Sequence, residues 1–288
     1  HAMDQLKKML AMGVTTVEAK SGYGQDYDTE IKQLHVTRKL NASQPIELVS
    51  TFLGAHAVPP EYKGRSKAFL DFLLKEVMPV VKKENLAEFC DIFCEEGVFS
   101  VDESRQYLKK AREMGFKLKI HADEIVSLGG SELAGELKAT SADHLLHASD
   151  AGIKAMAENG VVSTLLPTTA FCLREPFARA REMIDAGCAV ALATDFNPGS
   201  GFTFSVPLML GLAVIYMHMT AEEAITALTL NGAAAVGRAD RIGSIEVGKQ
   251  ADLTILQYPS YKFLPYHTGV NIVEKVIKKG ELVHTASV

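Results

Sequence analysis

The sequence lacks the features that mark membrane proteins and nucleic-acid-binding proteins. No apolar run approaches the roughly 20 residues that a bilayer span requires, and no stretch resembles a signal peptide. The formal net charge of −5 is spread along 288 residues without a basic stripe, so we expect no nucleic-acid partner. Hydrophobic residues make up 47% of the chain and charged residues 23%, which is ordinary for a protein that buries a core. We therefore expect a cytoplasmic globular protein.

Cysteine is scarce. The chain has four, at Cys90, Cys94, Cys172 and Cys188. Cys90 and Cys94 have the same parity in "EFCDIFCEEG", so a strand would point both side chains to one face. No second pair accompanies them, which argues against a thiolate metal site. We predict that all four are small buried thiols in a reducing compartment.

No Gly-x-Gly-x-x-Gly turn follows any β-rich run, which disfavours a dinucleotide-binding sheet. Instead, short β-rich runs alternate with helical segments, a pattern typical of parallel strands. The runs cover residues 14–22, 46–56, 89–97, 117–124, 142–149, 161–168 and 189–199. Capping boxes are expected to begin two helices, at Ser100/Glu103 and at Thr220/Glu223, and the second of these helices is expected over residues 221–237. Helices are expected to end at Gly115, Gly160 and Gly187.

The predicted fold class is α/β, a TIM-type (β/α)8 barrel that lacks its first strand. Polar residues at nearly every strand end favour a barrel over an open sheet. The opening "HAMDQLKKML" is expected to form the helix after the missing strand. Beyond residue 240, "IGSIEVGKQADLTILQ" and "IVEKVIKKGELVHTA" alternate in a β manner. We expect residues 1–240 to form the barrel and residues 241–288 a small, partial β appendage.

In a barrel, the side chains at the C-terminal ends of the strands surround one mouth. Here they are Lys20, Ser21, Tyr23, His56, Glu95, Glu96, His121, Glu124, His144, His147, Thr168, Thr169, Asp195 and Asn197. His121 and Glu124 leave the same strand, and Asp195 directly follows a buried apolar run, where an unpaired carboxylate is costly. Imidazoles and carboxylates that converge in this way indicate a metal site or acid–base chemistry.

The same residue types predict how a metal site would work. Neutral imidazole and carboxylate suit Zn²⁺ or Fe²⁺, and a bound ion makes hydroxide available near neutral pH. Asp195 or Glu124 can move the proton of the water, and His144 can stabilise an oxyanion. Asp123 and Asp143 are expected to face solvent or to lie behind the site. The remaining histidines have no partner pattern and are interpreted as ordinary surface or core residues: His35, His218, His267 and His284.

Five motifs, in this order, resemble a known family. They are "VEAKSGYG", "FLGAHAVP", "IHADE", "SADHL" and "ATDFNPGS". Together they look like the mononuclear branch of the metal-dependent amidohydrolases, and more narrowly like the imidazolonepropionases of histidine breakdown. Those enzymes open the ring of 4-imidazolone-5-propanoate to give N-formimidoyl-L-glutamate. The resemblance covers essentially the whole chain.

The resemblance implies a role for each matching residue. His121 and Asp195 would bind one divalent ion, zinc or iron. Glu124, His144 and Asp195 would be catalytic, with Glu124 holding the nucleophilic water or the substrate ring and His144 polarising the ring carbonyl. The implied substrate-binding residues are Tyr23, His56, Glu124, Asn197, Gly199 and Ser200. A small-molecule substrate and a homodimer are also implied.

The sequence departs from the family pattern in one respect. The His-x-His pair that ends strand one in the family, and an upstream Arg for the substrate carboxylate, are absent from these 288 residues. The chain is therefore expected to be part of a longer polypeptide, to be completed from elsewhere, or to be inactive. Two further alternatives are a related deaminase or cyclic-amide hydrolase, and a metal-free lyase that uses Lys20 as a Schiff base.

Overall fold

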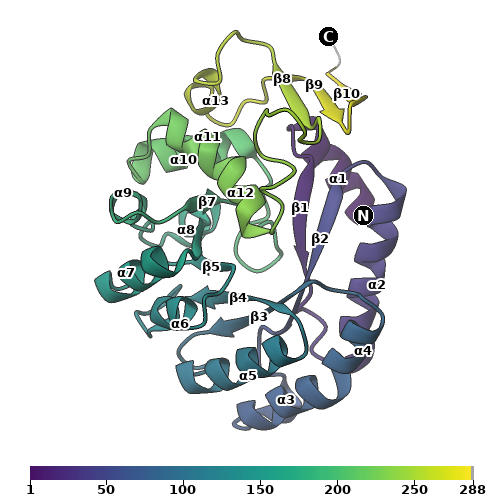
Figure 1. Cartoon of the computed structure of the whole chain (residues 1–288), viewed down its shortest axis with the longest axis vertical. Coiled ribbons are helices and arrows are strands. Elements are labelled where there is room, and N and C mark those ends of the chain that lie inside the picture. The colour runs from purple at the N-terminus through teal and green to yellow at the C-terminus, as the bar shows by residue number, and fades with distance from the viewer. Residues whose placement is uncertain (287–288) are drawn as a thin grey trace. The chain divides into compact units, whose positions relative to one another are not determined.

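The structure, a computed structural model, describes residues 1–286 as alternating strands and helices (Figure 1). The strands are β1 (Thr16–Lys20), β2 (Glu47–Ala55), β3 (Phe89–Cys94), β4 (Lys117–Ala122), β5 (Ser141–His144), β6 (Val162–Leu165), β7 (Val190–Leu192), β8 (Leu253–Leu256), β9 (Val273–Lys278) and β10 (Glu281–Thr285). The α-helices are α1 (Ala2–Ala11), α2 (Tyr27–Ser43), α3 (Ser66–Phe72), α4 (Met78–Lys83), α5 (Val101–Glu113), α6 (Gly130–Glu136), α7 (Asp150–Asn159), α8 (Pro167–Leu173), α9 (Ala180–Asp185), α10 (Val206–Tyr216), α11 (Ala221–Leu228), α12 (Leu230–Ala235) and α13 (Phe263–Tyr266). A 3₁₀ turn spans Pro60–Tyr62, and a π-helical turn, Leu73–Val77, joins α3 to α4.

Strands β1 to β7 belong to one sheet in chain order, and β8 to β10 form an antiparallel sheet in the order β10–β9–β8. The pairs β2–β3, β3–β4, β4–β5 and β6–β7 are parallel. At least one helix separates each strand of the first sheet from the next, as parallel pairing requires. The predicted α/β class and strand–helix repeat are thus confirmed. The small sheet lies inside residues 241–288, and a domain boundary at residue 240 stays a prediction.

Contacts divide the chain into two compact units. We call residues 1–17, 44–47 and 162–288 the first unit, and residues 18–43 and 48–161 the second unit. The second unit contains most of β1 and β2, all of β3 to β5, and helices α2 to α7. The first unit contains β6, β7, the small sheet and the remaining helices.

Strand β3 shows why the second unit folds as it does. Its sequence "FCDIFC" is almost continuously buried, as expected for a strand covered on both faces. Phe89 and Ile92 are fully buried in this strand. Helix α5 follows with the predicted capping box, in which the Ser100 hydroxyl accepts the N–H of Glu103 and the Glu103 carboxylate accepts the N–H of Ser100. This cap fixes where the helix begins after the strand.

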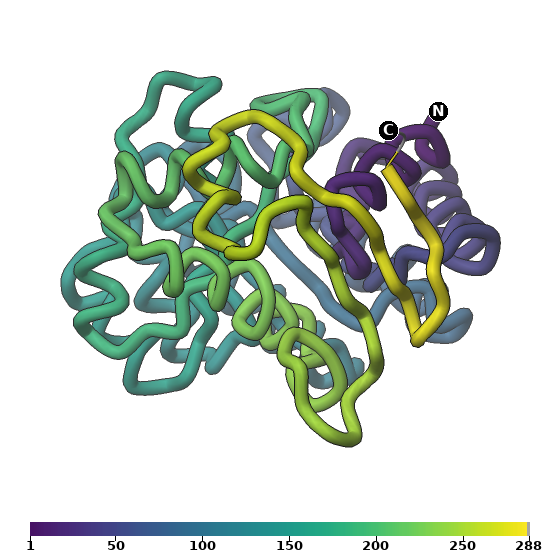
Figure 2. The backbone as a smooth tube through the Cα atoms, turned by 90° about the horizontal axis from the view of Figure 1, so that it is seen from above, coloured from purple at the N-terminus to yellow at the C-terminus, as the bar shows by residue number. Residues whose placement is uncertain are grey.

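In the first unit, the beginning of the chain packs against its end. Figure 2 shows the purple N-terminal helix beside the yellow C-terminal strands, and α1 contacts β9 and β10. Asn271 donates to the carbonyl of Ala11 at 2.9 Å, and Thr254 donates to the carbonyl of Gly13 at 3.0 Å. Gly13 has φ of +87°, and a Cβ there would lie 2.7 Å from the Thr254 side chain. This close approach therefore requires glycine.

Several sequence-based expectations need correction. The helix predicted over residues 221–237 is two helices, α11 and α12, which meet at Thr229. The last three predicted strands are shorter than expected. Strand β5 ends at His144, where His144 and Leu145 both have positive φ, and Pro167 begins α8 inside the stretch 161–168 that was predicted as strand. Cys172 is exposed, although all four cysteines were predicted to be buried.

The described residues include no helix that is both long and apolar enough to span a bilayer.

Candidate metal and catalytic site

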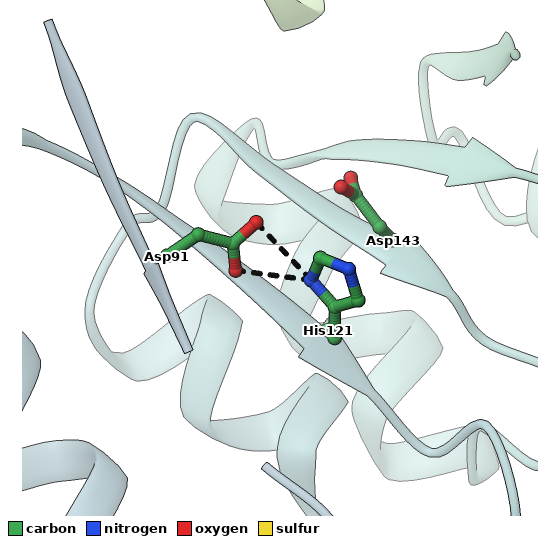
Figure 3. Close-up of side chains that lie close together, drawn as sticks. All are labelled: Asp91, His121 and Asp143. Carbon is green, nitrogen blue, oxygen red and sulfur yellow. Dashed lines mark hydrogen bonds and ion pairs between the residues drawn. The ribbon is translucent and has the colours of Figure 1, made fainter. Parts of the chain in front are cut away.

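Three buried side chains meet where β3, β4 and β5 run side by side in the second unit. Asp91, His121 and Asp143 offer ligand atoms that all lie within 4.8 Å of one another, so they form a candidate metal site (Figure 3). Nδ1 of His121 lies 3.1 Å from each carboxylate oxygen of Asp91. Asp91 also accepts the N–H of Ile92 at 2.7 Å, which fixes the orientation of its carboxylate.

Lys20, at the end of β1, occupies the position between the two carboxylates. Its Nζ lies 2.5 Å from Oδ2 of Asp91 and 2.6 Å from Oδ2 of Asp143. Burial alone would lower the pKa of Lys20, but Asp143 and Asp91 outweigh it and hold that pKa well above the ordinary value. Burial would likewise raise the pKa of Asp91, but His121 and Lys20 hold it well below its usual range. The lysine is therefore an ammonium ion and Asp91 is a carboxylate.

This arrangement decides which atoms can receive a metal ion. The ammonium is already paired with the facing oxygen of each carboxylate, so an ion bound by these oxygens would have to displace it. Nδ1 of His121 is turned to Asp91, so Nε2 is the ring nitrogen left for an ion. Burial alone would lower the pKa of His121, but Asp91 outweighs it and raises that pKa, so an ion bound at Nε2 would replace a proton there. The chain therefore fits a metal through His121 Nε2. A protonated Lys20 is also a poor nucleophile, which argues against the Schiff-base alternative.

Behind Lys20 the charged network continues through β4 and β1. Lys119, buried on β4, donates to Glu18 at 3.1 Å and to the hydroxyl of Ser141 at 3.0 Å. Ser141 in turn donates to Asp143 at 3.0 Å. Every carboxylate of this network therefore has a cation or a hydroxyl beside it, as buried charges require.

The loop after β4 brings Glu124 to His144. Nε2 of His144 lies 3.4 Å from Oε2 of Glu124, and both side chains are largely buried. The carboxylate of Glu95 accepts the backbone N–H groups of residues 124–126 at 2.9, 2.9 and 3.3 Å. Asp123 accepts the N–H groups of residues 128–131, each at 3.0 Å, and the Ser131 hydroxyl. Two buried acids thus fix the loop that presents Glu124.

A row of rings runs through the same unit. The ring centroids of Tyr23 and His56 are 5.0 Å apart, those of His56 and His121 are 6.1 Å apart, and those of His121 and His144 are 5.0 Å apart. Tyr23 is 48% exposed, whereas His121 and His144 are buried. The row therefore leads from the surface of the unit to the buried imidazoles.

The other predicted site residues belong to the first unit. Asp195 has φ of 50°, in the sparsely populated left-handed region, and its carboxylate accepts the Thr169 hydroxyl at 2.6 Å. The side-chain oxygen of Asn197 accepts the N–H groups of Gly199 and Ser200 at 2.7 and 2.8 Å. Its amide nitrogen donates to the carbonyl of Asp195 at 2.8 Å. Asn197 therefore shapes the loop that presents Asp195, Gly199 and Ser200.

The structure thus brings Tyr23, His56, His121, Glu124 and His144 together in one unit, and Asp195, Asn197, Gly199 and Ser200 together in the other. Sequence reasoning missed Asp91 and Lys119. The available signal for Asp91 was a charged residue inside the apolar run "FCDIFC", whereas Asp195 was singled out because it follows such a run, and Lys119 lies in the alternating run "KLKIHA", which carries no such signal. Asp123 and Asp143 were expected to face solvent or to lie behind the site. Both are buried, so the solvent-facing alternative is wrong.

Comparison with known proteins assigns the family. The amidohydrolase family model matches residues 2–283. An imidazolonepropionase of Clostridium tetani is 66% identical over 99% of this chain, which spans 68% of that relative's length. The chain belongs to the amidohydrolase family and, within it, to the imidazolonepropionases. An imidazolonepropionase of Bacteroides thetaiotaomicron is 65% identical over 96% of the chain and 67% of its own length.

Solved amidohydrolase structures share the fold. A zinc-bound adenosine deaminase from Xanthomonas campestris superimposes with a TM-score of 0.71 at 20% identity, covering 98% of this chain and 69% of its own. The guanine deaminase of E. coli gives a TM-score of 0.75 at 16% identity, covering 99% of this chain and 74% of its own. At these identities the likeness concerns the fold alone. It confirms the predicted barrel-type architecture of this amidohydrolase.

Proposed function

We propose that this amidohydrolase opens the ring of 4-imidazolone-5-propanoate by adding water to its cyclic amide, in the cytoplasm, as a step of histidine degradation. The oxygen of water bonds to the ring carbonyl carbon, the carbon–nitrogen bond of the ring breaks, and the released nitrogen takes a proton. The product is N-formimidoyl-L-glutamate. One observation carries the proposal: a 66% identical imidazolonepropionase matches over 99% of the chain.

The proposed roles follow from the contacts of each side chain. Glu124 holds the attacking water and accepts its proton, since its carboxylate is presented by a fixed loop beside His144. His144 donates to the ring carbonyl oxygen as negative charge develops there. Tyr23 and His56 contact the substrate from the exposed end of the row of rings.

The loop of the first unit is proposed to bind the carboxylate end of the substrate. Asn197 shapes the loop, and Ser200 and the backbone at Gly199 supply donors suited to a carboxylate. Asp195 is proposed as a metal ligand and, as the alternative to Glu124, as the acceptor of the water proton. Its carboxylate is oriented by the Thr169 hydroxyl.

His121, through Nε2, and Asp195 would hold one divalent ion, zinc or iron. When bound, such an ion would lower the pKa of a water so that hydroxide is available near neutral pH. The zinc-bound adenosine deaminase of the same fold is consistent with zinc. We also propose, on the family resemblance, that the protein is a homodimer.

The test is metal analysis and a ring-opening assay on the full-length product of the reading frame. We expect about one divalent ion per chain and loss of the imidazolone absorbance on reaction. His121→Ala should abolish metal binding and ring opening. The matched control, Lys154→Ala, changes the exposed face of α7 and should leave both properties intact. Full activity in the His121→Ala protein would overturn the proposal.

A further inference from the structure

We propose that Asp91 is a positioning residue for the metal ligand His121. By accepting a hydrogen bond from Nδ1–H, it fixes the imidazole as the tautomer whose Nε2 lone pair is available to a divalent ion. The inference rests on the proposed function, because it takes His121 as a metal ligand. It adds a residue on β3 that none of the recognised motifs contains.

The first support is the fixed geometry of the acceptor. Oδ1 of Asp91 accepts the N–H of Ile92 at 2.7 Å, and Oδ2 is bound by Lys20 at 2.5 Å. The carboxylate is fully buried, so it has no solvent to turn toward. Nδ1 of His121 lies 3.1 Å from both oxygens, centred on the carboxylate. The acceptor is thus held from two directions, and the imidazole ring is aligned with it (Figure 3).

The second support is the charge of the acceptor. A carboxylate accepts hydrogen bonds and donates none, so the facing nitrogen of His121 must carry a proton. A neutral imidazole with a proton on Nδ1 has its lone pair on Nε2. Histidine ligands of metals commonly donate their other N–H to a carboxylate in this way, which fixes the ring and raises its basicity as a ligand.

The third support is the place of Lys20. The ammonium contacts Asp91 and Asp143 together, so one oxygen of each carboxylate is already paired with a cation of the chain itself. Their role toward a metal is therefore indirect, through the imidazole. Asp143 has no hydrogen bond to His121 among the described contacts shown in Figure 3, whereas Asp91 has contacts through both oxygens. The two acids share one cation and differ in their contact with the histidine.

That difference supplies a matched control. Asp91→Asn and Asp143→Asn each remove one negative charge beside Lys20, but only Asp91→Asn alters the acceptor of His121 Nδ1–H. An asparagine at position 91 has one carbonyl oxygen for three donors, namely Ile92 N–H, Lys20 and His121. The electrostatic effect on a bound cation is common to both variants, so any excess loss in Asp91→Asn measures the hydrogen bond.

The experiment measures zinc affinity of the full-length protein by competition with a chromophoric chelator. We expect Asp91→Asn to weaken zinc binding about 10- to 100-fold, the usual effect of losing such a partner. Asp143→Asn should weaken zinc binding much less, since it has only the electrostatic effect that both variants share. Equal affinities of the two variants would overturn the inference. If the unchanged protein binds no divalent ion at all, it is the proposed function that fails.

A second measurement needs no variant at position 91. Long-range ¹⁵N–¹H spectra of the metal-free protein, at a pH where the imidazole is neutral, report which ring nitrogen carries the proton. The His121 signals are identified by their loss in His121→Gln. We expect a protonated Nδ1 and an unprotonated Nε2. A proton on Nε2 in the unchanged protein would overturn the inference even if Asp91→Asn fails to fold.

Discussion

The carboxylate of Glu95 accepts the backbone N–H of Glu124 at 2.9 Å, so a buried acid at the end of β3 fixes the position of an acid that follows β4. The same carboxylate accepts two further N–H groups of that loop. Glu124, the catalytic candidate, is thus held in position through its backbone N–H, and its side chain lies beside His144.

Glu95→Gln should therefore lower kcat with little change in metal content. The new amide group places an N–H₂ against N–H donors, and the loop must shift. A displacement of about 1 Å in a reacting group costs on the order of 100-fold in rate. The measurement is steady-state kinetics with metal analysis, and Glu96→Gln, at the exposed neighbouring position, is the control. An unchanged kcat in folded Glu95→Gln would contradict this role.

Lys20→Met should destabilise the protein strongly. It leaves the carboxylates of Asp91 and Asp143 buried side by side without their cation, and removing one partner of such a group costs about 3–5 kcal/mol. Urea denaturation measures the loss. The double variant Lys20→Met/Asp143→Asn removes one of the two stranded charges and should regain part of the stability. A Lys20→Met protein as stable as the parent would show that the ammonium is dispensable.

Glu47 predicts a pH dependence in the first unit. Burial would raise the pKa of Glu47, but hydrogen bonds from Arg241 and Arg238 outweigh it and lower that pKa from its ordinary value of 4.5. A lowered pKa in the folded state means that the stabilisation is complete above the unfolded pKa and is lost as pH falls through the folded one. The stability difference between the parent and Glu47→Gln should therefore shrink below about pH 4.5, as followed by urea denaturation at a series of pH values. A difference independent of pH would refute the linkage.

Thiol reactivity should separate the cysteines. Cys172 is exposed on α8, whereas Cys90, Cys94 and Cys188 are buried. Burial raises the pKa of Cys94 to about 11, so little reactive thiolate is present there at neutral pH. An aromatic disulfide reagent should therefore titrate one thiol rapidly in the native protein and the others only after denaturation. Cys172→Ser should remove the rapid phase. If the rapid phase survives in that variant, another thiol is accessible.

Much of the fold was predictable because its signals are local. The Ser100/Glu103 and Thr220/Glu223 spacings predicted capping boxes, and Gly160 predicted a left-handed helix end, all of which the structure contains. The break at Thr229 was not predicted. The run around it contains Thr229, Asn231 and Gly232, which are poor helix formers, so the sequence held a signal for a break, but that signal does not specify the φ/ψ of −104°/−82° at Thr229.

The buried charge network was less predictable than the strand ends. Asp91 lies in the middle of "FCDIFC", and its partners Lys20 and His121 are 71 and 30 residues away in the sequence. Alternation along a strand gives the face of a residue but not the residue that meets it from a neighbouring strand. The role of Asp123 was missed for a related reason. Its positive φ turns the carboxylate back onto the N–H groups of its own loop, which a regular strand would not allow.

The lysine between Asp91 and Asp143 also bears on the order of assembly. Many small metalloproteins fold only when their ion is bound, because the free energy of metal binding supplies much of their folding free energy. Here an internal ammonium is paired with both acids before any ion is present. We therefore expect a chelator to abolish the activity of the protein without unfolding it. Metal supply in the cell would then determine the active fraction of the folded protein and not the amount of folded protein.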